Sequence, residues 1–207
     1  GLQHLVLSRG PPALDELLME QLRTALATFA AQGSPPLLLR SAHRTLFSPG
    51  WDLKQLVAAG YDDVRRFLSL FNTLLVDLFS YPGPTAAAIG GHAVAGGCLL
   101  AVACDLRVMA VGPARIGLSE VNLGVPVPAT AVRMLRRRLL PQALDDLVLH
   151  GDGLSAERAH ELGVVHQTAG AAELVAATSA GLRRLAAKPR RAYGAVKAFL
   201  LDTRTPT

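Results

Sequence analysis

Glu120 is the only acidic side chain in RIGLSEVNLGVPVP, residues 115–128, a stretch made mostly of small and apolar residues. This composition predicts burial, and burial raises the pKa of a carboxyl group because loss of water disfavours the charged form. A carboxylate with a pKa near the working pH is suited to take a proton from a carbon acid and return it. The alternative is an acid at a helix N-terminus, where it would stabilise the helix dipole.

Two glycine-bearing segments could supply hydrogen-bond donors for such a reaction. They are FSPGWDLK, residues 47–54, and IGGHAVAGGC, residues 89–98. Main-chain N–H groups between a strand and a helix lack internal partners and can point at a negative oxygen. Two such groups that converge on one point form an oxyanion hole for a carbonyl that gains charge.

Four segments, in this order, carry a resemblance to the crotonase superfamily, the enoyl-CoA hydratase/isomerase family. FSPGWDLKQL is similar to the family's F-S-x-G-x-D-L-K signature, and AAIGGHAVAGGCLLAVACDLRVM is similar to A-A-I-x-G-x-A-x-G-G-G-x-x-L-x-x-x-C-D-x-R. IGLSEVNLG resembles G-x-x-E-x-x-L-G, and LSAERAHELGVVHQ resembles L-x-A-x-x-A-x-x-x-G-L-V-x-x. Together these motifs span residues 47–167, more than half of the chain.

The resemblance implies that the main-chain N–H groups of Trp51 and Gly96 hold the carbonyl of an acyl-CoA thioester. It also implies a set of substrate-binding residues around these donors: Ser48, Gly50, Asp52, Leu53, Lys54, Gly97 and Leu99. Coenzyme A is then part of the substrate, and we expect no separate cofactor and no metal. Trp51 is bulkier than the Ala or Leu usual at its position, so the acyl slot is narrowed or redirected.

The family's hydratases use two glutamates, and here the first of the two positions holds Leu99. Leucine cannot accept a proton or orient water, so only Glu120 is left for acid/base chemistry. GGCL in place of GGCE resembles the family's Δ3,Δ2-enoyl-CoA isomerases. We therefore expect an isomerase of fatty acid metabolism that converts 3-enoyl-CoA to 2-enoyl-CoA by a single-glutamate 1,3-proton transfer.

Two alternatives stay open. One is another reaction of the family on acyl-CoA, as a hydratase, hydrolase or decarboxylase that recruits a group such as His43 or Asp146. The other is a noncatalytic module for acyl-CoA binding or oligomerisation. Lys54, together with Arg44 and Arg65, could meet the phosphates of coenzyme A or could simply be solvated.

Several further polar residues are expected to be structural. His92 has no catalytic role in the resemblance, and His43 fits a solvated loop. Asp105 is expected to make a buried polar contact with the backbone or with Arg107, since a buried acid needs partners. Asp145 and Asp146 are expected to be helix-surface charges.

The elements that must position these residues alternate between β and α. Predicted strands cover residues 2–8, 36–41, 85–89, 106–109 and 163–166. Predicted helices, from apolar spacing and stop signals, cover 13–31, 62–80, 96–104, 130–139, 141–149, 155–161 and two segments within 171–201 divided near Lys188. The alternation predicts an α/β fold.

With 207 residues, 50% hydrophobic and 18% charged, the chain fits one domain with a real core. The resemblance implies the crotonase (ClpP-like) spiral of ββα units with surrounding helices over residues 1–207. It also implies a C-terminal helical region, from about residue 171, that is short for the family. By resemblance we expect a homotrimer or a dimer of trimers.

The net charge of +5 does not by itself predict a nucleic-acid partner, because the cations are dispersed and aromatic residues make up 5% of the chain. The densest cationic run, Arg133 with Arg136, Arg137 and Arg138, is expected to form a solvated helix face.

Nothing in the sequence predicts a membrane partner. The longest apolar run, residues 85–111, is interrupted by Asp105 and Arg107, and GLQHLVLSRG lacks the features of a secretory signal. Cys98 and Cys104 fit buried thiols better than a disulfide or a metal pair. We therefore expect a cytoplasmic protein.

Overall fold

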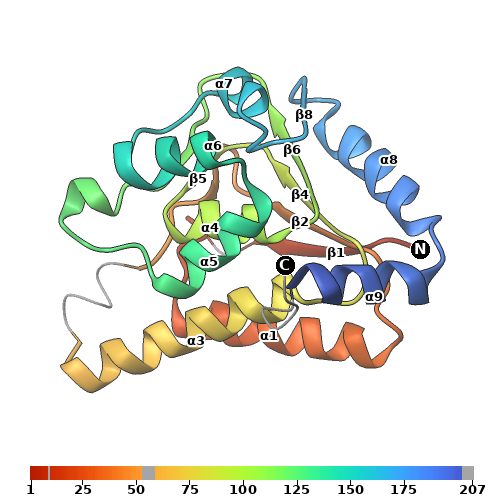
Figure 1. The fold of residues 1–207 in the computed structure, drawn as a ribbon, viewed down its shortest axis with the longest axis horizontal. Coiled ribbons are helices and arrows are strands. Elements are labelled where there is room, and N and C mark those ends of the chain that lie inside the picture. Colours follow the sequence, from red (N-terminus) through yellow and green to blue (C-terminus); the bar gives the residue numbers. More distant parts are fainter. Residues whose placement is uncertain (9, 53–58, 202–207) are drawn as a thin grey trace.

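Parallel strands in two sheets form the frame of the molecule (Figure 1). The computed structural model describes residues 1–8, 10–52 and 59–201. The larger sheet has the order β1-β2-β4-β6-β8, with strands Gln3–Leu7, Leu37–Ser41, Thr85–Ile89, Leu106–Ala110 and Gln167–Ala169. The smaller sheet has the order β3-β5-β7, with strands Leu46–Ser48, His92–Val94 and Ile116–Gly117.

The two sheets arise from a repeated ββα unit. In each of three successive turns one strand joins the larger sheet, the next strand joins the smaller sheet, and a helix follows. These helices are α3 (Tyr61–Phe79), α4 (Gly96–Ala103) and α5 (Ala129–Arg138). All strand pairs within the two sheets are parallel, as a helical return between strands requires. The spiral of ββα units expected from the sequence is confirmed.

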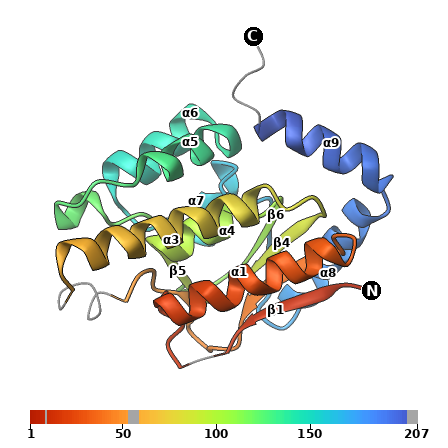
Figure 2. The same ribbon diagram turned by 90° about the horizontal axis from the view of Figure 1, so that it is seen from below.

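The larger sheet is covered on both of its faces. On β4 the residues of sequence TAAAI are all buried. Ala86 and Ala88 face a small apolar cluster with Leu174 and Leu182 of α8 (Leu174–Ala186), whereas Ala87 joins the main core. Figure 2 shows α8 on one side of this sheet and α1 and α3 on the other. Burial of both faces explains why this strand reads as continuously small and apolar rather than alternating.

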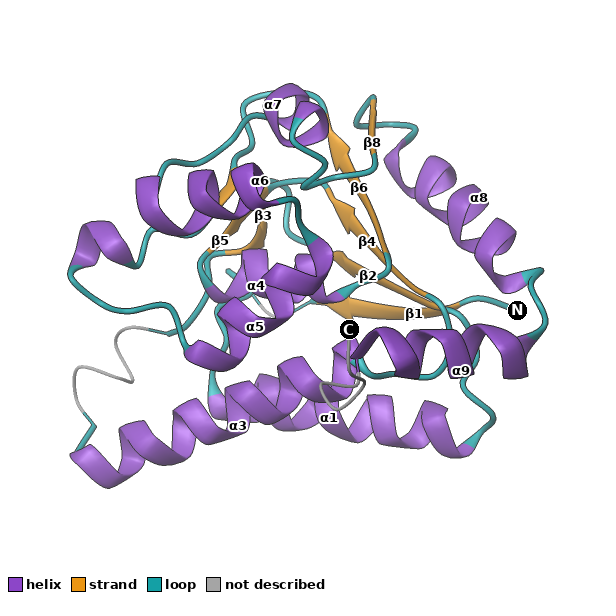
Figure 3. Cartoon of the chain, in the orientation of Figure 1, coloured by secondary structure: helices purple, strands orange, loops and turns teal. Residues whose placement is uncertain are grey.

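The helices form where the apolar period predicts them. Helix α1 (Glu16–Ala31) begins at Asp15, whose Oδ1 accepts a hydrogen bond of 2.7 Å from the Leu18 N–H. It packs side by side with α3. Among the described residues the remaining helical elements are α6 (Pro141–Asp145), a π-helical turn (Asp146–His150), α7 (Ala156–Glu161), α8 and α9 (Arg190–Leu201). The layered arrangement of helices around strands is clear in Figure 3.

The prediction of a strand at residues 163–166 is wrong. These residues form a turn after α7, and the strand that pairs with β6 is β8, which begins at the next residue, Gln167. Val164 and Val165 are apolar because they fill the core beneath the turn, and the Val165 N–H donates to the Ala159 carbonyl of α7. The prediction failed because a short apolar run does not by itself distinguish a buried turn from a buried strand.

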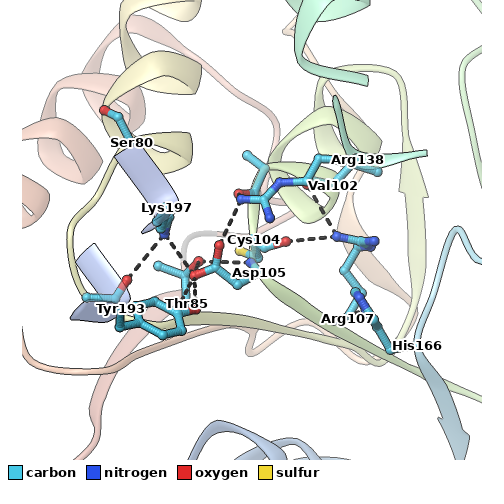
Figure 4. Close-up of polar contacts among 12 residues, drawn as sticks. Ser80, Thr85, Val102, Cys104, Asp105, Arg107, Arg138, His166, Tyr193 and Lys197 are labelled. Atoms are coloured by element: carbon cyan, nitrogen blue, oxygen red, sulfur yellow. Dashed lines mark hydrogen bonds and ion pairs between the residues drawn. The ribbon is translucent and has the colours of Figure 1, made fainter. Parts of the chain in front are cut away.

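A buried polar cluster joins α9 to the sheet and α5 (Figure 4). The Asp105 carboxylate accepts hydrogen bonds from Arg138 at 2.8 Å, Lys197 at 2.8 Å and Tyr193 at 2.9 Å, and Thr85 donates its main-chain N–H at 3.0 Å. The backbone contact expected of Asp105 is therefore confirmed.

Arg107, the alternative partner expected for Asp105, makes other contacts. Its buried guanidinium donates instead to main-chain carbonyls, including that of Cys104 at 2.8 Å. The expectation of a solvated face was wrong for Arg138, which turns inward because its spacing on α5 differs from that of the exposed Arg133 and Arg136.

Two other expectations can be compared with the described residues. Cys98 and Cys104 are free and buried, as expected. No helix in the described ranges is long and apolar enough to cross a membrane.

Candidate active site

The three strands of the smaller sheet all end at one cavity. Because the strands are parallel, their carboxyl ends lie at the same edge, and the segments that follow them meet there. Pro49 and Trp51 follow β3, Ala95 follows β5, and Ser119 and Glu120 follow β7. The cavity has a volume of about 110 Å³, and its lining residues are Pro49, Trp51, Ala95, Ser119, Glu120, Leu123 and Val125.

Glu120 is buried at this cavity with an unpaired carboxylate. The residue is 4% exposed, and neither carboxylate oxygen has a hydrogen-bond partner among the described residues. Burial raises the pKa of Glu120, and the nearby main-chain N–H groups of Glu120 and Ser119 offset part of this rise without forming hydrogen bonds. A buried carboxylate with no internal partner is available to exchange a proton with a ligand.

The alternative role of Glu120 as a helix cap has little support. Glu120 precedes a single 3-10 turn, Val121–Leu123, and its side chain makes no capping hydrogen bond. Its main-chain carbonyl accepts hydrogen bonds from Leu123 and Val125, which bends the following loop around the cavity.

The two expected oxyanion donors lie close to each other. Gly96 is the first residue of α4, and the chain enters it through Ala95 with φ 50° and ψ −124°. Gly50 has φ 90°, and a Cβ atom added there would lie 3.0 Å from the Gly96 nitrogen. This close approach requires glycine and brings Trp51, the next residue, beside Gly96.

The Trp51 amide is directed away from Leu14. Leu14 donates its N–H to the Gly50 carbonyl at 2.8 Å and accepts from the Asp52 N–H at 3.1 Å. Leu14 and Trp51 form a parallel bridge, in which both hydrogen bonds to Leu14 are made by the neighbours of Trp51, Gly50 and Asp52. The Trp51 N–H takes no part in it and lies on the other side of the strand.

Ser48 and Gly97 hold the scaffold of the site. The Ser48 hydroxyl donates to the Pro12 carbonyl at 2.8 Å and accepts from the Gly50 N–H at 3.2 Å. A Cβ atom on Gly97 would lie 2.2 Å from the Ser48 carbonyl oxygen. Neither residue lines the cavity, so contact of Ser48 or Gly97 with substrate stays a prediction.

The other predicted substrate-binding residues are not all brought to the cavity. Leu99 is completely buried within α4 and belongs to the core. Asp52 lies at a shallow surface depression beside Asp15 and Glu20 of the α1 region. Leu53 and Lys54 lie outside the described residues, as does any contact of theirs with coenzyme A.

Glu120 is the only carboxylate among the described residues that line the cavity. Asp146 is instead paired with Arg158 at 3.4 Å and with His150 at 3.5 Å. His43 accepts hydrogen bonds from the main-chain N–H groups of Thr45 and Leu46.

His92 has a structural contact, since its Nδ1 accepts a hydrogen bond of 3.2 Å from the Arg115 N–H. No group of three His, Cys, Asp or Glu side chains that could hold a metal ion occurs in the part of the chain described.

The sequence reading missed the setting of the Trp51 side chain. The indole packs edge-on against Phe67 and Phe71 of α3, and its Nε1 is buried without a partner among the described residues. The one available signal was a large aromatic residue at a position where the resembling family has a small one.

Comparisons with known proteins agree with this geometry. A family model described as Enoyl-CoA hydratase/isomerase matches residues 9–206. The human enoyl-CoA hydratase domain-containing protein 2, mitochondrial, is 38% identical over 130 residues, which are 63% of this chain and 44% of that protein. The enoyl-CoA isomerase/hydratase fer4 of Mycosarcoma maydis is 31% identical over 179 residues, 82% of this chain and 65% of that protein. The chain therefore spans less than two thirds of the length of these relatives.

Solved structures share the fold. An enoyl-CoA hydratase/isomerase family protein from Pseudomonas syringae has a TM-score of 0.90 and 26% identity, with 98% of this chain and 89% of that chain covered. Human mitochondrial delta3-delta2-enoyl-CoA isomerase has a TM-score of 0.90 and 23% identity, with 95% and 78% covered. The second likeness concerns the fold alone.

Proposed function

Because the chain belongs to the enoyl-CoA hydratase/isomerase family, we propose that it moves a double bond in an acyl-CoA thioester, converting 3-enoyl-CoA to 2-enoyl-CoA. Coenzyme A enters as part of the substrate. The observation that carries this proposal is the lone carboxylate among the described residues that line the cavity, Glu120. Leu99 stands at the sequence position where the hydratases of the family carry their other glutamate.

The reaction requires one base and one oxyanion site. The Glu120 carboxylate takes a proton from C2 of the 3-enoyl thioester, and the electron pair of that C–H bond delocalises onto the thioester oxygen. The main-chain N–H groups of Trp51 and Gly96 hold this oxygen as it becomes negative. Glu120 then returns the proton to C4, which leaves the double bond between C2 and C3. No water is consumed and no other group changes its protonation state.

The surroundings of Glu120 suit this role. A raised pKa makes the carboxylate a stronger base than an exposed glutamate, and the proton it gains stays shielded from solvent between the two transfers. The base must be ionised to start the reaction, so activity should fall as the pH drops through the raised pKa. The cavity is far below the roughly 300–1,000 Å³ typical of pockets for drug-sized ligands, which fits the reacting end of an acyl group.

Substitution of Glu120 tests the proposal directly. We expect Glu120→Gln to reduce kcat for 3-butenoyl-CoA by about 10³-fold, since a positioned general base contributes roughly 10²–10⁴-fold. The rate is followed by the absorbance of the conjugated 2-enoyl product. Asp146→Asn is the matched control and should keep nearly the parent rate, because Asp146 pairs with Arg158 and does not line the cavity.

Two outcomes would contradict the proposal. One is an unchanged rate in Glu120→Gln. The other is loss of the conjugated absorbance when 2-butenoyl-CoA is supplied, which would indicate hydration and favour the hydratase activity named in several relatives.

We also propose that the chain assembles as a homotrimer or a dimer of trimers. The support is an exposed apolar stripe on α9, formed by Val196, Phe199 and Leu200. Their spacing of three and four residues places them on one face of the helix.

A further inference from the structure

The Trp51 side chain presents a hydrogen-bond donor that no acceptor among the described residues engages. Its indole Nε1 is buried and has no partner among the described residues. The indole N–H can only donate, and a buried donor that has lost water and gained nothing in exchange is rare in folded proteins. Such a group calls for an acceptor beyond the described residues, such as a bound ligand.

The indole ring is held in one orientation beside the oxyanion site. Its centroid lies 5.9 Å from that of Phe67 and 5.3 Å from that of Phe71, and both pairs are edge-on at 82°. A Cβ atom added to Gly96 would lie 3.1 Å from both Cδ1 and Nε1 of Trp51. The polar edge of the ring therefore lies against Gly96, whose N–H is one of the proposed oxyanion donors.

Trp51 and Glu120 line the same cavity, yet they do not satisfy each other. Both Glu120 carboxylate oxygens lack hydrogen bonds among the described residues, as does Trp51 Nε1. A bound thioester brings one acceptor in every case, its carbonyl oxygen, whatever the acyl chain. Glu120 faces the carbon from which the proton is taken, so the donors at Gly96 and Trp51 are left for the oxygen.

We propose that the Trp51 indole N–H donates to the thioester oxygen as a third donor, together with the main-chain N–H groups of Trp51 and Gly96. This inference rests on the proposed function. The gain is largest in the transition state, because the oxygen accepts more strongly as it takes up enolate charge. A small residue at position 51 would supply the main-chain donor alone.

Nuclear magnetic resonance gives a test that needs no turnover. Trp51 is the only tryptophan in the sequence, so a ¹H–¹⁵N spectrum contains a single indole signal. We expect this signal to move downfield with 2-butenoyl-CoA and to stay near its free position with 2-butenyl-CoA, the thioether that lacks the carbonyl oxygen. Calorimetry establishes that each ligand is bound at the concentrations used.

The Trp51→Phe variant tests the catalytic consequence. Phenylalanine keeps an aromatic ring against Phe67 and Phe71 and keeps the main-chain N–H, so only the side-chain donor is lost. We expect kcat for 3-butenoyl-CoA to fall about 100-fold, as for other single oxyanion donors, with KM changed much less. Phe71→Leu is the control: it disturbs the packing of the indole but keeps its N–H, so kcat should fall less than about tenfold and stability should fall instead.

The outcomes separate the inference from the proposed function. Equal indole shifts with thioester and thioether, or Trp51→Phe with the parent kcat, would overturn the third donor while a strong effect of Glu120→Gln leaves the isomerase standing. Failure of 2-butenoyl-CoA to bind at all would overturn both.

Discussion

At the scale of single residues, the Glu120 side chain is buried, has no hydrogen-bond partner in the described part of the chain, and has a raised pKa. Such a group is unfavourable for folding, because the ionised form is poorly solvated in the native state and well solvated in the unfolded state. An arrangement that weakens the fold and exposes a proton acceptor to a cavity is typical of a functional site.

The pH dependence of the unfolding free energy should reveal the unfavourable burial of the ionised Glu120 side chain. The folded-state pKa of Glu120 is above its ordinary value of about 4.5, so the protonated side chain contributes its full stability below that pH. The contribution is lost as the pH rises through the higher folded-state pKa, since the native state binds the proton more tightly than the unfolded state. Glu120→Gln cannot ionise. We expect its unfolding free energy to rise relative to that of the parent protein as the pH increases from about 4 to about 8.

Urea unfolding of both proteins across this pH range measures the difference. Asp146→Asn serves as the comparison, because Asp146 is paired with Arg158 and His150 and its loss should not improve stability at high pH. A stability difference between Glu120→Gln and the parent that stays constant with pH would show that the Glu120 pKa is not raised in the folded protein.

The residues of the site were predictable to different degrees. Glu120 could be singled out because an isolated acid is visible in the sequence, whereas Trp51 and Gly96 were named only through the family resemblance. In the structure Trp51 lines the cavity with Glu120, and its ring lies beside Gly96. The unpaired indole of Trp51 could not be predicted, since it depends on Phe67 and Phe71 from a separate helix. The hydrogen bond from the Ser48 hydroxyl to the Pro12 carbonyl could not be predicted either.

At the scale of elements, α9 is held by charges as much as by apolar contact. Lys197 lies on its inner face and donates to Asp105 at 2.8 Å and to the Gly83 carbonyl at 3.2 Å. Burial alone would raise the pKa of Asp105, but the charges of Lys197 and Arg138 outweigh it and hold the pKa below its usual value. Removal of one partner from such a buried group leaves a charge without full compensation.

Lys197→Met should therefore loosen α9. Arg138 still pairs with Asp105, so we expect a loss near the lower end for broken buried ion pairs, about 3 kcal/mol. In the Lys197→Met variant, amide hydrogen exchange should be faster in α9 than in α3. Lys188→Met is the matched control, since this exposed lysine lies in the turn before α9 and its loss should change stability by less than about 0.5 kcal/mol. Equal effects of the two substitutions would contradict an anchoring role for Lys197.

The helices and strands were predictable where they are long or where proline and glycine mark their ends. The periods of α1 and α3 and the Tyr81-Pro82-Gly83-Pro84 stop gave bounds within a few residues of those observed. The smaller sheet was missed because its strands have two or three residues and pair with segments more than twenty residues away. Their position is decided by parallel pairing, which no local pattern reports.

At the scale of the whole molecule, the ββα spiral places the site at the carboxyl ends of the smaller sheet and leaves α9 at the periphery (Figure 2). This helix has two different faces. Tyr193 and Lys197 point inward to Asp105, whereas Val196, Phe199 and Leu200 are exposed, with Phe199 71% exposed. Exposed apolar residues grouped on one face are typical of a surface that binds another protein.

Phe199→Asp should therefore disrupt assembly without unfolding the chain. A carboxylate in the middle of an apolar interface would be buried without a partner in the oligomer but solvated in the free chain, so the substitution acts on association alone. By light scattering we expect the parent protein to have the mass of three or six chains and Phe199→Asp to shift towards a single chain. Tyr61→Asp is the control, since Tyr61 is 78% exposed at the start of α3, away from the α9 stripe. If Phe199→Asp kept the parent mass, the outer face of α9 would not be the assembly surface.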